Sequence, residues 1–194
     1  MNIDMIIFCN IINEKMSKSL GNFILGKDLA QQYGGQVVRW VLNATHYRSP
    51  INFTDEIFAS ATSEINKIYT SLKQASLKLD LANKFNENID EQYKDKYLTC
   101  LADDLNISGA MTILFDVVKE LNMSIRVREV DFEKVSTLFN TANYMLDLIG
   151  MYKYDKKLTE EEKELYQNWQ DAKANKDFAL ADEIRTKLID KGIL

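Results

Sequence analysis

Apolar residues recur every three or four positions along most of this chain, a spacing that predicts amphipathic helices. The longest such run begins after Thr54 and continues to Leu79. Two further runs follow Asn106 and Asp131, and the second of them stops at Gly150. The pattern predicts a chain built mainly from helices that pack their apolar faces into a bundle.

Residues that cap helices stand at the start of these runs. Thr159 and Glu162 have the spacing of a capping box, and Asp28 and Asp177 are further candidate N-caps. Glycine and proline mark the expected ends, because glycine permits a left-handed C-cap and proline disfavours a helical residue before it. The expected helices are residues 28–34, 36–47, 54–79, 89–103, 106–121, 131–150, 159–169 and 178–191, with a polar linker at 83–88.

One proline and seven glycines in 194 residues leave few helix breakers, which also favours long helices. The first stretch differs, because the apolar residues near its start predict a buried strand or the edge of a larger sheet. These residues are Ile6, Ile7, Phe8, Ile11 and Ile12. The stretch is too short for a membrane span, which needs about 18 apolar residues, and it has no basic flank of a targeting signal. We therefore expect a mainly α, cytoplasmic protein: a helical bundle preceded by a small irregular segment.

Cysteine and histidine usage argues against a metal site within this chain. Cys9 and Cys100 lie far apart in apolar stretches, as expected for buried, reduced thiols. His46 is the only histidine, so the ligands of a zinc site are lacking.

Residues 15–22 read Lys-Met-Ser-Lys-Ser-Leu-Gly-Asn. Two ammonium groups three residues apart, with the small hydroxyls of Ser17 and Ser19 beside them, suit a loop that folds over a polyphosphate. The alternative is an ordinary surface loop. The same string is the nucleotide-loop signature of class I aminoacyl-tRNA synthetases, and the chain resembles that family from here onward.

The charge distribution favours a local phosphate site over a broad basic surface. The net charge of the chain is −5, although nucleic-acid binders are usually basic. Residues 1–50 carry five basic and three acidic side chains, whereas residues 101–150 carry four and eight. The cationic end is therefore the one that holds the Lys-Met-Ser-Lys-Ser loop.

Four further strings narrow the resemblance to cysteinyl-tRNA synthetases. Residues 46–54 read His-Tyr-Arg-Ser-Pro-Ile-Asn-Phe-Thr and residues 101–106 read Leu-Ala-Asp-Asp-Leu-Asn. Residues 172–178 and 181–185 are similar to that family's C-terminal helical pair. The resemblance covers residues 13–192 and implies three parts. Residues 1–50 would be the end of the catalytic domain, with the loop and a stem-contact segment. Residues 51–155 would form the anticodon-side bundle, and residues 156–194 a C-terminal helical hairpin.

The resemblance implies ATP-dependent attachment of cysteine to tRNA(Cys) through a cysteinyl-adenylate. Lys18 would contact the leaving phosphates of ATP, which binds with Mg²⁺, and Lys15 would support it. Ser17 and Ser19 would donate hydrogen bonds or shape the loop, and Met16 completes it. The cysteine pocket and the zinc site would belong to an N-terminal half that precedes this segment in the family. The chain is then a fragment, a truncated reading frame or a remnant, and we expect it to be inactive alone.

Four residues are candidates for tRNA contact: Arg39, His46, Arg48 and Trp169. Each also has a structural interpretation. His46 could pack at a helix end, and Trp169, like Phe178, could belong to the hairpin core. Asp103 and Asp104 suit a turn before the Asn106 cap better than a metal site, because adjacent carboxylates on a helix diverge.

Two other functions fit the same sequence. One is a non-catalytic helical module that binds tRNA or docks on a partner protein, which the amphipathic helices favour and the acidic middle disfavours. The other is a related ligase that joins cysteine to a sugar amine, which would not need the C-terminal helical pair.

Overall fold

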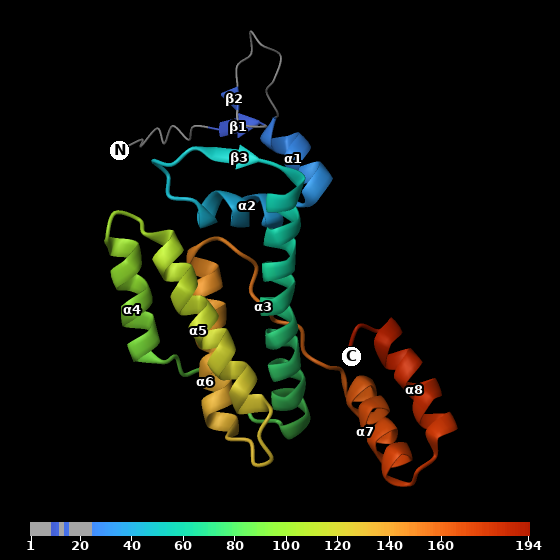
Figure 1. Ribbon diagram of the computed structural model, residues 1–194. Helices are drawn as coiled ribbons and strands as arrows, with labels where there is room; N and C mark the ends of the chain where they lie inside the picture. The colour runs from blue at the N-terminus through green and yellow to red at the C-terminus, as the bar shows by residue number, and fades with distance from the viewer. Residues whose placement is uncertain (1–8, 12–13, 16–24) are drawn as a thin grey trace.

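The computed structural model describes residues 9–11, 14–15 and 25–194. A small sheet and two short helices lie at one end of a long central helix, a bundle lies along it, and a separate hairpin follows (Figure 1). The helices of the described residues are α1 (Gly26–Tyr33), α2 (Gly35–Ala44), α3 (Asp55–Ala82), α4 (Glu91–Ala102), α5 (Ile107–Ile125), α6 (Phe132–Leu148), α7 (Glu160–Ala174) and α8 (Phe178–Asp190). The expectation of a mainly helical fold is confirmed.

A three-stranded sheet lies beside α1 and α2, in the order β2-β1-β3 (Figure 1). The central strand β1 (Cys9–Ile11) pairs antiparallel with β2 (Glu14–Lys15) and parallel with β3 (Ile51–Phe53). Ile51 and Phe53 are buried, as expected for alternate residues on one face of a strand. The strand expected near the start thus contains Ile11, while Ile6, Ile7, Phe8 and Ile12 lie outside the described residues.

Most helix starts expected from capping residues are confirmed. The side chains of Thr54, Asn106, Asp131 and Asp177 each accept a hydrogen bond from a backbone N–H three residues later. The capping box at the start of α7 is complete on both sides. These contacts form between near neighbours in the chain, which is why local sequence predicts them.

Two expected boundaries near the front are wrong. Helix α1 begins at Gly26, so Asp28 lies in its first turn and Leu25 is the N-cap. The positive end of the helix dipole still stabilises the Asp28 carboxylate there, which explains an acidic residue that does not cap the helix. Helix α2 ends at Ala44 rather than Tyr47, because residues 46–49 form a turn in which Ser49 N–H donates to the His46 carbonyl.

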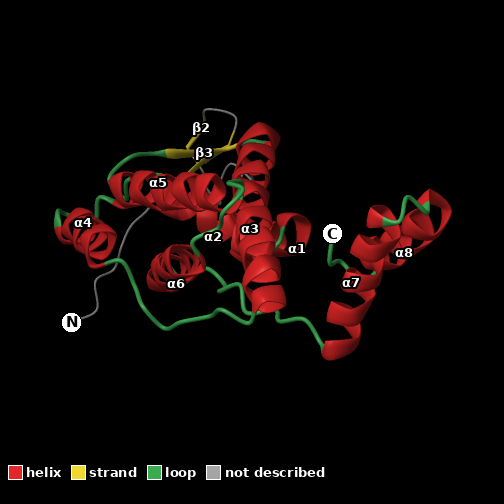
Figure 2. Ribbon diagram, turned by 90° about the horizontal axis from the view of Figure 1, so that it is seen from below, coloured by secondary structure: helices red, strands yellow, loops and turns green. Residues whose placement is uncertain are grey.

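The main core lies where α2, α5 and α6 pack against α3 (Figure 2). Trp40, Leu72, Leu114 and Leu146 are completely buried in it. The indole N–H of Trp40 donates to Glu64 over 2.9 Å, so the polar atom of this large buried side chain is satisfied.

Side chains of α3 and α6 bind the backbone of the linker between α6 and α7. Tyr154 N–H donates to Asn143 Oδ1 over 2.7 Å, and Asn143 Nδ2 donates to the Tyr154 carbonyl over 3.2 Å. Further bonds of this kind are Tyr69 Oη to Tyr152 O, Ser76 Oγ to Lys156 O, and Leu158 N to Asp80 Oδ2. Alternate residues of the linker are held, so it runs extended along the bundle.

The last two helices form a hairpin with a small core of its own. Ile184, Leu188 and Ile193 are buried there, and Leu77 of α3 packs against them. Lys73 on α3 donates to the carbonyl of Leu194 over 2.9 Å. The hairpin therefore rests on α3, although it stands apart from the bundle in Figure 1. The division into residues 1–50, 51–155 and 156–194 stays a prediction.

Candidate nucleotide-loop and RNA-contact site

The candidate ATP loop begins at the end of the sheet. Lys15 is the last residue of β2 and pairs in register with Asn10 of β1. Met16, Ser17, Lys18 and Ser19 lie outside the described residues. Because β1 also pairs with β3, and β3 leads into α3, the start of the loop is connected through the sheet to the bundle.

The start of α3 is joined to α1 by aromatic and polar contacts. The rings of Tyr33 and Phe58 stack with centroids 4.0 Å apart, and Phe53 of β3 stacks on Phe58 at 5.8 Å. The Tyr33 hydroxyl donates a hydrogen bond to the carboxylate of Asp55. This bond raises the pKa of the Tyr33 phenol, because the anionic acceptor favours the protonated donor.

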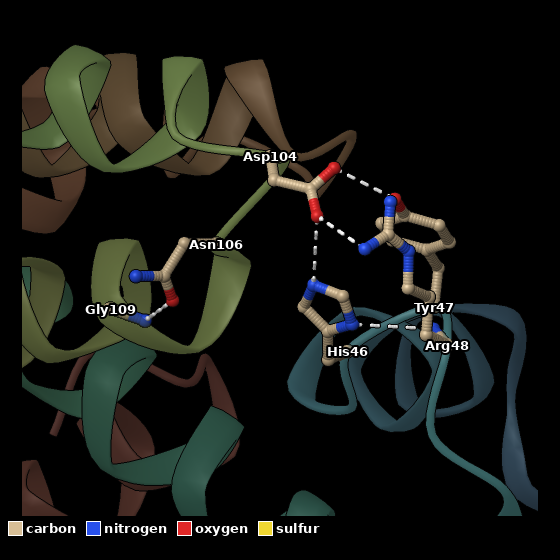
Figure 3. Close-up of polar contacts among 6 residues, drawn as sticks. All are labelled: His46, Tyr47, Arg48, Asp104, Asn106 and Gly109. Atoms are coloured by element: carbon tan, nitrogen blue, oxygen red, sulfur yellow. Dashed lines mark hydrogen bonds and ion pairs between the residues drawn. The ribbon is translucent and has the colours of Figure 1, made fainter.

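Three consecutive residues after α2 converge on Asp104, in the turn between α4 and α5 (Figure 3). The Tyr47 hydroxyl donates to Asp104 Oδ1 over 2.7 Å, and Arg48 Nη1 lies 3.3 Å from Asp104 Oδ2. His46 Nε2 lies 3.9 Å from the same oxygen, while its Nδ1 accepts from the Arg48 N–H over 3.3 Å. The His46 ring stacks on that of Tyr47. This cluster connects the segment after α2 to the turn before α5.

Solvent reaches this cluster and screens its charges, so their effects are confined to the cluster itself. The hydrogen bond to Asp104 raises the pKa of the Tyr47 phenol. The Arg48 guanidinium lies 5.1 Å from the Tyr47 ring centroid, a distance suited to a cation–π contact. Arg48 is exposed and keeps free N–H donors directed at solvent, since one carboxylate cannot use all five.

Arg39 lies apart from this cluster, on α2 near the end of α6. Its guanidinium occupies space left by Gly150, where an added Cβ would come within 2.6 Å of Nη1. Gly150 has φ +72°, and the adjacent Ile149 carbonyl accepts from Asn43 Nδ2 over 2.9 Å. A cation at the C-terminal end of α6 is favoured by the helix dipole.

Trp169 is far from the other candidate residues, in the core of the C-terminal hairpin. It packs edge-on to Tyr166 at 5.4 Å, and Lys173 Nζ lies 4.2 Å from the centroid of its ring. Phe178, which could have belonged to the same core, is instead 67% exposed. It lines a surface groove with Trp169 and Arg185. Phe178 is thus the aromatic ring that this hairpin presents to solvent.

Sequence reasoning missed the contacts that Asp104 makes with residues 46–48. Its turn position is as expected, since Asn106 Oδ1 caps α5 by accepting from Gly109 N–H over 2.9 Å (Figure 3). Asp104 and Leu105 both adopt positive φ, so the backbone at these two residues does not continue the helix. The only sequence signal was a pair of adjacent acidic residues, which does not indicate a partner more than 50 positions away. Cys100 is half-buried against the core rather than fully buried.

Comparison with known proteins identifies two family segments in this chain. Residues 3–63 match the model of the class I tRNA synthetase (C) catalytic domain, and residues 96–153 match that of the DALR domain. A cysteine–tRNA ligase of Brevibacillus brevis is 35% identical over 195 residues, which cover 95% of this chain. One from Acinetobacter baumannii is 30% identical over 96% of the chain.

The chain is similar to cysteinyl-tRNA synthetases. It corresponds to the C-terminal portion of these proteins and spans 42% of the length of each of the two relatives. The catalytic-domain match runs from the front of the chain into α3, and the DALR match runs from α4 into the linker after α6.

The cluster around Asp104 therefore joins the two family segments of this synthetase portion. Tyr47 belongs to the catalytic-domain match and Asp104 to the DALR match. Within residues 9–11, 14–15 and 25–194, no group of three or more His, Cys, Asp or Glu side chains is placed to hold a metal ion. No helix in the described part of the chain is long and apolar enough to cross a membrane.

Proposed function

We propose that this chain supplies the ATP loop and the tRNA-contacting helices of a cysteine–tRNA ligase, which attaches cysteine to tRNA(Cys) through a cysteinyl-adenylate. The similarity to cysteine–tRNA ligases over 95% of the chain carries the proposal. The Lys-Met-Ser-Lys-Ser string also falls inside the catalytic-domain match, which supports the proposal.

In the proposed reaction, the carboxylate of cysteine attacks the α-phosphorus of ATP and the bond to the leaving pyrophosphate breaks. Negative charge increases on the β- and γ-phosphate oxygens, so cations at those oxygens lower the barrier. Lys18 is proposed to make this contact with the leaving phosphates of the Mg²⁺-bound ATP, with Lys15 supporting it. Ser17 and Ser19 donate hydrogen bonds or shape the loop, and Met16 lies between Lys15 and Ser17. The cysteine pocket and its zinc ion are assigned to a part of the ligase other than this chain.

Arg39, His46 and Arg48 are proposed to face the tRNA, with Arg39 and Arg48 contacting its phosphates. The exposure of both arginines supports this role. A stacking contact is assigned to the hairpin groove, where Phe178 offers a more open ring than Trp169, whose ring lies against Lys173.

Two assays test the proposal. The purified chain is titrated with tRNA(Cys) at several salt concentrations, and its ATP–pyrophosphate exchange with cysteine is measured. We expect salt-dependent tRNA binding without exchange activity, because phosphate contacts release counterions and the cysteine pocket lies elsewhere. Residues 1–194 are then exchanged into the Brevibacillus brevis ligase in place of the matching segment. Loss of aminoacylation in a folded chimaera that still binds tRNA would contradict the proposal.

A non-catalytic RNA-binding module is the second candidate. It is favoured by the helical character of the described residues and by the match of residues 96–153 to the DALR domain. Tight tRNA binding by the chain together with an inactive chimaera would favour this function over the first.

A further inference from the structure

A cavity of about 330 Å³ opens between α2 and the turn that joins α4 to α5. Val38 and Ile51 line it and are 8% and 3% exposed, so they form its inner surface. Leu105, at the other side, is 53% exposed. Leu42, Ile107 and Tyr47 complete the apolar lining. A volume of this size, with an apolar lining and a few polar groups, is typical of small-molecule sites.

The polar lining residues Arg39, Asn43 and Thr45 are more exposed than this inner surface. Arg39 makes no ion pair with any carboxylate of residues 25–194, and Gly150 leaves room for its guanidinium. Asn43 uses its Nδ2 on the Ile149 carbonyl, which leaves its amide oxygen as an acceptor. The cavity therefore combines an apolar interior with one available cation and hydrogen-bonding groups.

Asp104, which precedes the lining residue Leu105, does not offer an unpaired negative charge. Its oxygens lie 2.7 Å from the Tyr47 hydroxyl and 3.3 Å from Arg48 Nη1. The charge of Asp104 is thus compensated on the side that faces the segment after α2. Of the described residues that line the cavity, only Arg39 is charged, so its lining carries a positive charge.

We propose that this cavity binds a single nucleotide, with its base among the aliphatic side chains and its phosphate against Arg39. Asn43 and Thr45 would then bond to the edge of the base or to a ribose hydroxyl. The inference rests on the proposed function, because it takes an RNA as the partner that presents an unstacked nucleotide. A free nucleotide has the same chemistry, so the experiment includes both sources.

The test uses the full ¹⁵N-labelled chain and three probes: nucleoside 5′-monophosphates, a short single-stranded RNA, and tRNA(Cys). The amide signals of Thr45, Leu105 and Ile107 report on the cavity. Arg39→Ala removes the phosphate partner. Leu105→Gly removes one wall and suits the φ of +55° at this position. Arg128→Ala is the matched control, because this exposed arginine lies in the loop after α5, outside the cavity.

We expect shifts confined to the cavity amides. Arg39→Ala should weaken binding about tenfold, as is usual when a charge-assisted bond is lost, and Arg128→Ala should leave it unchanged. Shifts with the RNAs alone assign the site to RNA, and shifts with free nucleotides alone assign it to a free nucleotide. Binding of tRNA without any shift of these amides overturns the inference and leaves the proposed function standing. Shifts with monophosphates in a chain that does not bind tRNA support the cavity and contradict the proposed RNA role. Equal weakening by Arg39→Ala and Arg128→Ala overturns the inference.

Discussion

The phenol of Tyr47 donates a 2.7 Å hydrogen bond to Asp104 Oδ1, although the two residues are 57 positions apart. One belongs to the segment that resembles a synthetase catalytic domain and the other to the DALR segment. With Arg48 on the same carboxylate, this contact connects the front of the chain to the turn before α5. It is the polar counterpart of the packing between α2 and α5.

Asp104→Ala should lower the pKa of the Tyr47 phenol toward the usual value of about 10, because the bond to an anionic acceptor is lost. A pH titration of the Tyr47 ring-carbon signal by NMR measures the effect. Asp103→Ala, at the neighbouring exposed position, is the control and should leave the signal unchanged. An unchanged titration in Asp104→Ala would show that Asp104 is not the acceptor in solution.

Glu120→Gln should remove part of the pH dependence of stability. Glu120 pairs with Lys134 at 2.7 Å and accepts from the Tyr93 hydroxyl over 2.7 Å, and these contacts lower the pKa of its carboxyl group. The bond also raises the pKa of Tyr93 to about 12. A lowered carboxyl pKa stabilises the fold above the unfolded pKa of about 4.3, and this gain is lost as pH falls through the folded value.

Chemical unfolding at pH 7 and at about pH 3 measures the effect of Glu120→Gln. The variant should be less stable than the parent chain by about 1 kcal/mol at pH 7, since the pair is only partly buried. The difference should shrink at the lower pH. Glu133→Gln, which makes no ion pair with any of residues 25–194, is the control. An equal difference at both pH values would contradict the role of ionised Glu120.

Asn143→Ala should free the linker after α6. It removes both bonds to the backbone of Tyr154 and leaves that N–H and carbonyl unpaired, at a cost of about 2 kcal/mol. Urea unfolding measures the loss, and hydrogen exchange should show faster exchange in residues 152–158. Asn66→Ala, on an exposed position of α3, should have little effect on either measurement. Unchanged exchange in the linker would contradict this assignment.

Gly150→Ala should destabilise the chain by about 1 to 2 kcal/mol, the usual cost of a side chain in the left-handed region. Thermal unfolding of Gly150→Ala is compared with that of Gly26→Ala, where an added methyl group would meet no atom within 4 Å. The new Cβ would also displace Arg39. Combining Gly150→Ala with Arg39→Ala should therefore recover part of the loss. If Gly150→Ala is no less stable than Gly26→Ala, the backbone there is not left-handed in solution.

Lys18→Ala in the chimaeric ligase should slow adenylate formation about a hundredfold, because a preorganised group at the leaving phosphates contributes about 3 kcal/mol. ATP–pyrophosphate exchange measures this step, and a filter-binding assay measures tRNA affinity, which should change little. Lys27→Ala, beyond the loop on α1, is the matched control. Equal losses of exchange and of tRNA binding would show that Lys18 is structural rather than catalytic.

Local sequence predicts the helices best where a side chain contacts its own neighbours. Thr54, Asn106 and Asp131 cap α3, α5 and α6 as expected, since each reaches an N–H three residues ahead. Asp28 has the same chemistry but does not cap α1, because an acidic residue is favoured throughout the first turn of a helix. Its position thus left the start of α1 ambiguous.

Strand β3 was not expected, and its cause is not local. Three residues have too short a pattern to indicate a strand, and β3 exists because it pairs with β1, about 40 positions earlier. Local sequence did not predict the exposure of Phe178 either. The helical period marks an apolar residue as a core candidate, but the position of α7 decides which residues of α8 are covered.

The sequence by itself determined the helical class of this protein, most of its caps and, through residues 15–22 and 46–54, its family. Each of these depends on residues that are adjacent or a few positions apart in the chain. Only the tertiary structure decided that Asp104 meets Tyr47, that Gly150 makes room for Arg39, and that a cavity opens beside α2. These contacts depend on how rigid helices pack at a distance, and packing is set by the whole core rather than by any local pattern.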